Sequence, residues 1–232
     1  MTHGNRVGVQ VKVCGVTRVE DVEIAIALGA EMIGLNFYPP SPRCLSIERA
    51  RTLCGAIAGR AIAIGVFVNA SRDYIEERRR ELRLDMLQFH GDEDESALRG
   101  WQVKVIRALR LRVNDPLATM PVPSSQTSVG DASSIGNRAS ELWPKSIADY
   151  LLLDTYHPGL YGGSGQARTL DGLERLDLTR VFLSGGLTPA NVAAAAALNP
   201  YAVDVASGVE SAPGIKDHDK LRSFIANAKS PG

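Results

Sequence analysis

The chain has 232 residues, 44% of them hydrophobic, and its 26 Lys and Arg residues balance 26 Asp and Glu residues. This length suits one domain, and the balanced charge argues against nucleic acid or an anionic membrane as the main partner, while a small anionic ligand stays possible. No stretch approaches the roughly 20 apolar residues of a membrane span, so we expect a cytoplasmic protein without a membrane partner.

Eight short apolar runs alternate with amphipathic stretches along the chain. The runs are rich in Val, Ile or Leu and end near Gly, Asn, Asp or Ser, a pattern typical of parallel strands that are buried on both faces. In chain order the predicted strands are Val9–Cys14, Met32–Phe37, Ala61–Phe67, Asp85–Phe89, Val103–Ala108, Tyr150–Asp154, Arg180–Ser184 and Ala202–Ala206.

The stretches between these runs predict helices with recognisable ends. They are Val19–Leu28 with Gly29 as C-cap, Ile47–Ile57 behind Ser46, Asp73–Leu82 behind Ser71, Ala190–Leu198 with Pro189 in the first turn, and a last helix from Asp217 to about Ala228. Strand and helix alternate in a single domain's length, which predicts an α/β fold, a (β/α)₈ TIM barrel over residues 9–229 behind a flexible leader of residues 1–8. No GxGxxG follows the first strand, which disfavours a dinucleotide-binding open sheet.

One segment, residues 112–145, breaks the alternation where a fifth helix is expected. It contains four prolines and a stretch rich in Ser and Gly over residues 124–140. We predict an irregular Ser/Pro-rich loop in place of a full fifth helix, with at most a short helix near Ala139–Trp143. Such a loop either covers an active site or is a tolerated insertion, and the second interpretation is favoured because long loops are often simply mobile.

Barrels of this type carry their active sites at the carboxyl ends of the strands. The polar residues expected there are two catalytic candidates, Cys14 and Asp154, and four substrate-binding candidates, Arg43, Gln88, His90 and Asp204. A phosphate site is predicted from glycine-rich loops, which let several backbone N–H groups approach an anion. Its candidates are Gly163 after the sixth strand, Gly185 and Gly186 after the seventh, and Ser207 and Gly208 after the eighth.

Each of these residues also has a plain structural interpretation. Cys14 is either a general base or a small buried hydrophobe, and Asp154 is either a general acid or the cap of the next helix. Arg43 either holds a carboxylate or is an ordinary surface arginine, while His90 either lines the pocket or caps a turn. The three cysteines form no CxxC pair, so neither a disulfide framework nor a metal site is expected.

Several motifs in order resemble the phosphoribosylanthranilate isomerase family of tryptophan biosynthesis. The motifs run from about Val9 to Lys229 and include Val11–Thr17, Gly34–Arg43, Gly65–Asn69, Leu87–Asp92, Leu152–Thr155, Tyr161–Gly165, Leu183–Leu187, Val203–Glu210 and Pro213–Asp217. The chain departs from the family pattern at Gln166–Gly172, where Arg168 stands near the usual lysine, and at Asn36, whose position is usually apolar.

The resemblance implies an Amadori rearrangement of N-(5′-phosphoribosyl)anthranilate without a metal or cofactor. By family roles, Asp154 would protonate the furanose ring oxygen, Cys14 would remove the C2′ proton, and Arg43 would hold the anthranilate carboxylate. Gly186, Ser207 and their neighbours would bind the phosphate. The protein is then expected to act on a small phosphorylated substrate as a monomer or homodimer.

Other barrel enzymes fit the sequence less well. The related isomerase of histidine biosynthesis would be expected to use paired aspartates and a second phosphate loop, and indole-glycerol-phosphate synthase would need lysines at the strand ends. The alternative from another class is a non-catalytic phosphosugar-binding protein on the same fold. Cys14 and Asp154 beside Arg43 argue against that alternative.

Overall fold

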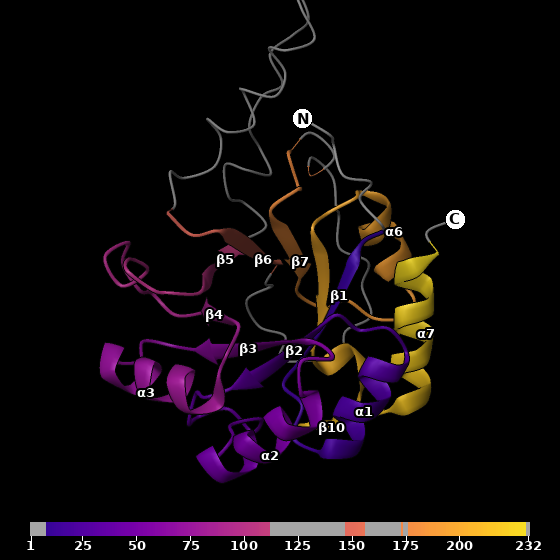
Figure 1. Ribbon diagram of the computed structural model, residues 1–232. Helices are drawn as coiled ribbons and strands as arrows, with labels where there is room; N and C mark the ends of the chain where they lie inside the picture. Colours follow the sequence, from indigo (N-terminus) through magenta and orange to yellow (C-terminus); the bar gives the residue numbers. More distant parts are fainter. Residues whose placement is uncertain (1–7, 112–146, 156–172, 174–175, 231–232) are drawn as a thin grey trace, which may run out of the picture.

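Eight parallel strands close into a barrel in the computed structural model (Figure 1), which describes residues 8–111, 147–155, 173 and 176–230. Neighbours in sequence are neighbours in the barrel, and the eighth strand pairs back with the first. The strands are β1 (Gln10–Cys14), β2 (Met32–Asn36), β3 (Ile62–Phe67), β4 (Met86–Phe89), β5 (Lys104–Leu111), β6 (Tyr150–Thr155), β7 (Val181–Ser184) and β8 (Ala202–Val205). The predicted barrel and each of its predicted strands are confirmed.

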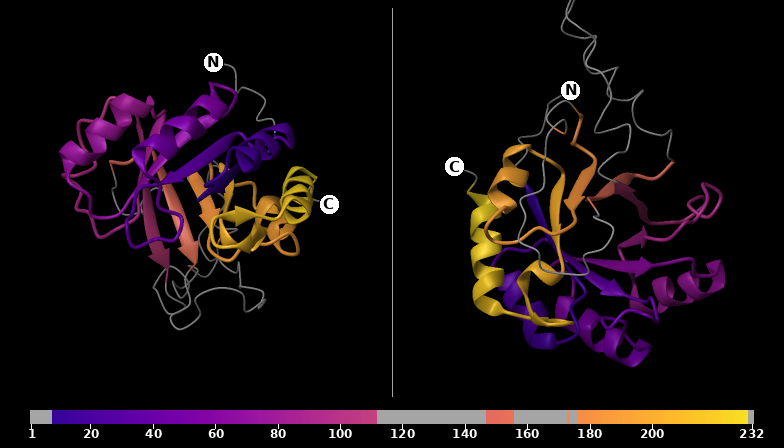
Figure 2. Two further views of the ribbon diagram at one scale, coloured as in Figure 1. Left: turned by 90° about the horizontal axis from the view of Figure 1, so that it is seen from below. Right: turned by 180° about the vertical axis from the view of Figure 1, so that it is seen from behind.

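Five helices among the described residues lie on the outside of the barrel (Figures 1 and 2). They are α1 (Val19–Ala27), α2 (Ile47–Ile57), α3 (Arg72–Leu82), α6 (Val192–Ala197) and α7 (His218–Lys229). Their predicted caps are present: Ser46 accepts from the Arg49 N–H, and Asp217 accepts from two backbone N–H groups at the start of α7. At the end of α1, the Gly29 and Ala30 N–H groups bond back to Ile26 and Ala25 in a Schellman motif.

Two of the connections differ from a regular alternation of strand and helix. The predicted helix Ala190–Leu198 begins later, at Val192, and Pro189 lies in the turn before it. In that turn the Thr188 carbonyl accepts from the Asn191 and Val192 N–H groups, and the Asn191 side chain accepts from the Thr188 N–H at 2.7 Å. After β4, residues 91–103 form turns and bends instead of a helix, and Asp94 stabilises one turn by accepting from two backbone N–H groups.

The interior of the barrel has an apolar floor near the amino ends of the strands. Its side chains form a hydrophobic cluster separate from the larger one between barrel and helices. The floor consists of Met32, Ile64, Met86, Ile106, Ala108, Tyr150, Leu152, Phe182 and Ala202. A closed, filled floor of this kind leaves the carboxyl ends of the strands as the end of the barrel available for chemistry.

A small antiparallel hairpin follows β8 and returns the chain to the mouth of the barrel. A three-residue 3-10 helix, η2 (Ser207–Val209), leads into β9 (Glu210–Ala212), which pairs with β10 (Ile215–Lys216). The register places Lys216 opposite Glu210. This hairpin therefore carries two charged residues toward the end of β1.

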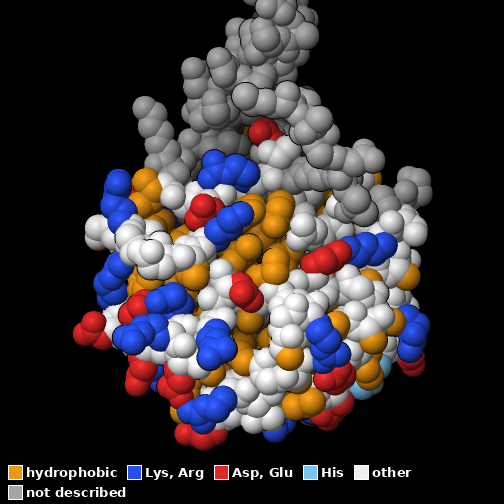
Figure 3. Space-filling view, viewed as in Figure 1, with side chains coloured by type: hydrophobic (Ala, Val, Ile, Leu, Met, Phe, Trp, Pro, Cys, Tyr) orange, Lys and Arg blue, Asp and Glu red, His pale blue; other side chains and the backbone are white. Residues whose placement is uncertain are grey.

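The surface carries both signs of charge. Figure 3 shows basic and acidic side chains interspersed over one face, which agrees with the balanced composition. No helix in the described part of the chain is long and apolar enough to cross a membrane. Residues 1–7 of the expected leader 1–8, and the whole segment 112–145 with its short helix expected near Ala139–Trp143, lie outside the described residues. The leader and the domain bounds 9–229 stay predictions.

Candidate active site

A buried lysine lies at the centre of the polar part of the barrel interior. The Lys12 side chain is fully buried, and its Nζ donates to Gln88 Oε1 at 2.9 Å and to Asp204 Oδ1 at 3.0 Å. Burial lowers the pKa of Lys12, but the charges of Asp204 and Cys14 outweigh burial and raise it overall. Lys12 is therefore a fixed positive charge, held by strands β4 and β8 from its own position on β1.

Cys14 ends β1 on the same inward-facing side as Lys12, two residues further along the strand. Its side chain is 9% exposed. Burial raises the pKa of the Cys14 thiol, and the positive charges of Lys12 and Lys216 offset only part of that rise. The surroundings therefore supply two cations that favour a thiolate in a site whose burial disfavours one.

Asp154 is the last residue but one of β6, across the barrel, and lies beside His90, which follows β4. The His90 Nε2 is 3.5 Å from Asp154 Oδ2, and the two side chains are 23% and 26% exposed. On its other side the His90 Nδ1 lies 2.8 Å from Gln88 Nε2. Gln88 thus connects His90 to Lys12. The candidate acid and the surroundings of the candidate base are joined by one chain of side-chain contacts.

Arg43 is held by a carboxylate of the protein itself. Its Nε donates to Glu210 Oε1 at 2.8 Å, and its Nη2 donates to Glu210 Oε2. Burial raises the pKa of Glu210, but Arg43 and Lys216 outweigh burial and lower it overall. The sequence prediction of a carboxylate-holding fork is compatible with this arrangement, because a guanidinium has five N–H donors and two of them bond to Glu210 within the described part of the chain.

Lys216 and Glu210 are functional candidates that the sequence analysis did not identify. Lys216 is buried, and its Nζ donates to Glu210 Oε1 at 3.0 Å, to the Cys14 carbonyl at 2.7 Å and to the Ala206 carbonyl at 3.0 Å. Both residues belong to motifs that carry the family resemblance, but nothing local to residue 216 indicates a partner about 200 residues away. Lys216 thus joins the carbonyl that ends β1 and the carbonyl that follows β8 to Glu210, and Glu210 holds the Arg43 guanidinium.

The loops after β7 and β8 touch through their backbones. Gly185 and Gly186 both adopt positive φ, at 87° and 69°, a conformation that favours glycine. A Cβ at Gly208 would lie 1.8 Å from the Leu187 carbonyl oxygen, so no side chain fits there. The structure brings four of the predicted phosphate-site residues, Gly185, Gly186, Ser207 and Gly208, into adjacent loops. The fifth, Gly163, lies outside the described residues.

Asp204 and Asn36 have partners that explain their positions. Asp204 receives Lys12 on one carboxylate oxygen, and its other oxygen accepts from Ser184 Oγ at 3.2 Å. Asn36, at the end of β2, accepts from the Tyr38 N–H at 2.8 Å and so supports the turn that leads to Arg43. Among the described residues, no group of three or more His, Cys, Asp or Glu side chains could hold a metal ion.

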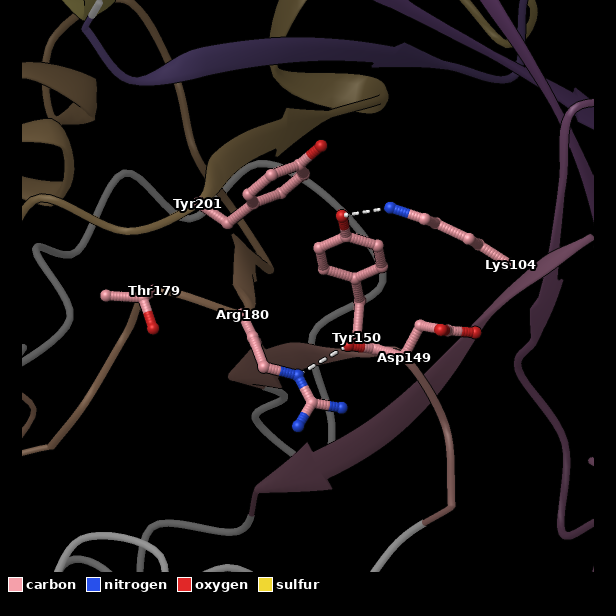
Figure 4. A pocket seen from close by; sticks show the side chains of 6 residues that line it. All are labelled: Lys104, Asp149, Tyr150, Thr179, Arg180 and Tyr201. Atoms are coloured by element: carbon pink, nitrogen blue, oxygen red, sulfur yellow. Dashed lines mark hydrogen bonds between the residues drawn. The ribbon is translucent and has the colours of Figure 1, made fainter. Parts of the chain in front are cut away.

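An open pocket of about 470 Å³ lies at the opposite end of the barrel (Figure 4). It is lined by Lys104, Asp149, Tyr150, Thr179, Arg180 and Tyr201, at or near the starts of β5 to β8. Lys104 donates to the Tyr150 hydroxyl at 3.2 Å, and Arg180 donates to the Asp149 carbonyl at 2.7 Å. None of the residues predicted for the active site lines this pocket.

Comparison with known proteins identifies one family. Residues 11–227 match the family model described as N-(5′-phosphoribosyl)anthranilate (PRA) isomerase. The N-(5′-phosphoribosyl)anthranilate isomerase of Pseudomonas fluorescens (strain Pf0-1) is 40% identical over 218 residues, which are 94% of this chain and 97% of that protein.

Solved structures agree with this match. The phosphoribosyl anthranilate isomerase of Thermus thermophilus is 33% identical with a TM-score of 0.72, and the match covers 94% of this chain and 97% of the other. A phosphoribosyl anthranilate isomerase in complex with reduced 1-(o-carboxyphenylamino)-1-deoxyribulose 5-phosphate is 32% identical with a TM-score of 0.69 and covers 95% and 98%.

Proposed function

The chain belongs to the N-(5′-phosphoribosyl)anthranilate isomerase family, and we propose that Cys14 and Asp154 carry out its Amadori rearrangement. In this reaction of tryptophan biosynthesis, N-(5′-phosphoribosyl)anthranilate becomes 1-(2-carboxyphenylamino)-1-deoxyribulose 5-phosphate. The observation that carries the assignment is the placement of one thiol and one carboxyl at the mouth of the barrel, on β1 and β6, beside the two adjoining glycine loops.

The first step needs an acid. Asp154 donates a proton to the furanose ring oxygen, the C1′–O bond breaks, and the nitrogen lone pair forms a Schiff base. The carboxylate left on Asp154 lies beside His90 Nε2, at a distance of 3.5 Å. Such contacts commonly shorten when substrate binds.

The second step needs a base. The Cys14 thiolate removes the C2′ proton, and the electron pair moves to give an enolamine that tautomerises to the ketone. Burial opposes the thiolate, and the two buried ammonium groups of Lys12 and Lys216 oppose that effect. The reaction is thus an internal redox exchange in which the protein only moves protons.

The remaining groups hold the substrate. Arg43 offers its unused N–H donors to the anthranilate carboxylate, and the loops with Gly185, Gly186, Ser207 and Gly208 bind the phosphate, together with Gly163. Gln88 and Asp204 are almost fully buried and already bonded to Lys12, so we assign them supporting roles beneath the substrate. The phosphate supplies binding energy that positions the reacting end of the sugar.

The experiment that tests this function follows the fluorescence of phosphoribosylanthranilate as the purified protein consumes it. We expect turnover by the wild-type chain and saturable binding of the reduced product named above. The non-catalytic alternative, a phosphosugar-binding protein, predicts binding without turnover. A folded wild-type protein that binds the reduced product and leaves phosphoribosylanthranilate unchanged would refute the proposal.

We also propose that the protein is cytoplasmic and acts as a monomer or homodimer. All three cysteines of the chain lie among the described residues, and none forms a disulfide, as expected in a reducing compartment. Sedimentation of the purified protein at several concentrations determines which of the two oligomeric states it adopts.

A further inference from the structure

The orientation of the Gln88 side chain is determined by its neighbour Lys12. An ammonium group has three N–H donors and no acceptor, so it requires an oxygen opposite it. The Gln88 Oε1 lies 2.9 Å from Lys12 Nζ, and the amide nitrogen therefore faces the other way. Because Gln88 is 1% exposed, no bulk water is available to compensate a reversed amide.

The amide nitrogen of Gln88 in turn determines which nitrogen of His90 carries the proton. The Gln88 Nε2 lies 2.8 Å from His90 Nδ1 and has only hydrogens to offer. Nδ1 must accept, and in a neutral imidazole the single proton then belongs to Nε2. The Nε2 is the atom that faces Asp154 Oδ2.

We propose that Lys12 and Gln88 set the tautomer of His90, and that His90 is a positioning residue which presents its Nε2–H to the Asp154 carboxylate. The tautomer follows from the described contacts alone. Its catalytic consequence rests on the proposed role of Asp154 as the acid. The other tautomer would turn a nitrogen lone pair toward the carboxylate and would repel it as soon as Asp154 has given up its proton.

This role explains why a glutamine lies beneath the site. The charge of Lys12 is already balanced by Asp204, at 3.0 Å. A carboxylate or a main-chain carbonyl in place of Gln88 would satisfy Lys12 equally well. Neither could donate to His90, because both are acceptors only. The amide of Gln88 accepts on one side and donates on the other, and so serves both neighbours at once.

The diagnostic variant is Gln88→Glu, which has the same shape but replaces the donor with an acceptor. We expect Lys12 to keep its partner, while His90 must now place a proton on Nδ1, either by changing tautomer or by becoming charged. The comparison variant is Gln88→Leu, which removes both contacts and leaves the tautomer unset. Both variants are compared with the wild type at equal folded fraction, measured by thermal unfolding.

The readout is ¹⁵N NMR of histidine-labelled full-length protein, which distinguishes protonated from unprotonated ring nitrogens. The chain has four histidines, and His90→Phe identifies the signals of His90. His218 serves as an internal control, because its Nε2 lies 2.9 Å from Asp21 Oδ1, next to α1 and away from Gln88. Its signals should be the same in every variant.

In the wild type we expect His90 to be protonated on Nε2 and unprotonated on Nδ1. In Gln88→Glu we expect a proton on Nδ1 and a kcat about 10- to 100-fold lower, with KM changed less than about threefold.

A wild-type His90 protonated on Nδ1 would overturn the proposal. So would a Gln88→Glu protein whose His90 signals do not change. A changed tautomer with wild-type kcat would overturn the positioning role and leave the tautomer assignment standing. Failure of the proposed function is seen separately, as absent turnover by the wild type.

Discussion

The two ends of the barrel interior are built from the same strands but have opposite characters. On β8, Ala202 belongs to the apolar floor and Asp204, two residues later, belongs to the charged mouth. On β6, Leu152 and Asp154 make the same change. Because alternate residues of a strand face inward, a step of two residues moves from the floor to the mouth. Stability and chemistry are therefore separated along each strand, and changes at the two ends should have separable effects.

The largest effect is expected from the two residues of the mouth that handle protons. Cys14→Ser and Asp154→Asn should each lower kcat by about 10²- to 10⁴-fold, because each removes a general base or acid. Both changes conserve shape, so the affinity for the reduced product should stay within a few-fold of wild type. An assay of phosphoribosylanthranilate loss measures kcat, and a binding titration measures the affinity for the reduced product. Near-normal turnover in either variant would remove that residue from the mechanism.

The floor should respond in the opposite way. Phe182 is fully buried and packs edge-on against Tyr150, with ring centroids 5.6 Å apart. Phe182→Ala should lower the free energy of unfolding by about 3–5 kcal/mol, with kcat per folded molecule near wild type. Denaturant unfolding and active-site titration check this pair of values. The milder Phe182→Leu should lose less stability. A floor variant that is stable but inactive would contradict the separation of the two ends.

Replacement of Lys216 should lower activity less than replacement of Cys14 does. The charged groups that act on the thiol include Lys12, Asp204, Lys216 and Arg43, and Lys216 lowers its pKa. Lys216→Met should raise the pKa of Cys14 further and move the acid limb of kcat/KM to higher pH. Lys216→Arg keeps the charge and should restore part of the shift. The rate of Cys14 alkylation against pH, followed by mass spectrometry, measures the same pKa without turnover. An unchanged pH profile in Lys216→Met would exclude this electrostatic role.

Cys54 offers a smaller effect outside the barrel, on α2. Burial, with Asp85 second, raises the pKa of this thiol from its ordinary value to about 11. Because the folded-state pKa is raised, the contribution to stability is complete below the ordinary thiol pKa and is lost as pH rises through about 11. Thermal unfolding between pH 8 and 11 should therefore show a decline in Tm that is shallower in Cys54→Ala. Equal slopes would show that the decline has another source.

The smallest effect is expected at the surface pair Arg51 and Glu81, which joins α2 to α3. Exposed ion pairs contribute about 0–1 kcal/mol, and salt screens them. Arg51→Ala should change the free energy of unfolding by less than about 1 kcal/mol and leave kcat unchanged. Denaturant unfolding at low and high salt checks it. A loss of several kcal/mol would show that contacts between the outer helices contribute substantially to the free energy of unfolding.

The fold was predictable because its signals are local. Buried strands in an α/β fold are continuous apolar runs. Ser46, Ser71 and Asp217 are N-caps that bond to backbone N–H groups within three residues of themselves. The structure begins α6 at Val192, two residues after the predicted start, because the turn around Pro189 is closed by Thr188 carbonyl bonds to both Asn191 and Val192 and local sequence does not fix a helix end to the residue.

The candidate site was predictable only as a set of strand ends. Position alone places Cys14, Asp154 and His90 at the mouth. The partners that give them their properties are far away in the chain: Lys12 bonds to Gln88 across 76 residues and to Asp204 across 192. Such pairs depend on barrel closure, which brings β1 against β8. The Arg43–Glu210–Lys216 arrangement is missed for the same reason.

The contact between Gly208 and the Leu187 carbonyl has a consequence for engineering of substrate range. At Gly208 the loops after β7 and β8 meet through backbone atoms, because the three atoms nearest to a Cβ there belong to the backbone of Leu187 and Thr188. A graft that replaces only one of these loops places a new backbone against a neighbour whose shape fits the original loop. Chimeras in this family should therefore exchange residues 185–188 and 206–209 together, as a single cassette, with the glycine at 208 left out of randomisation.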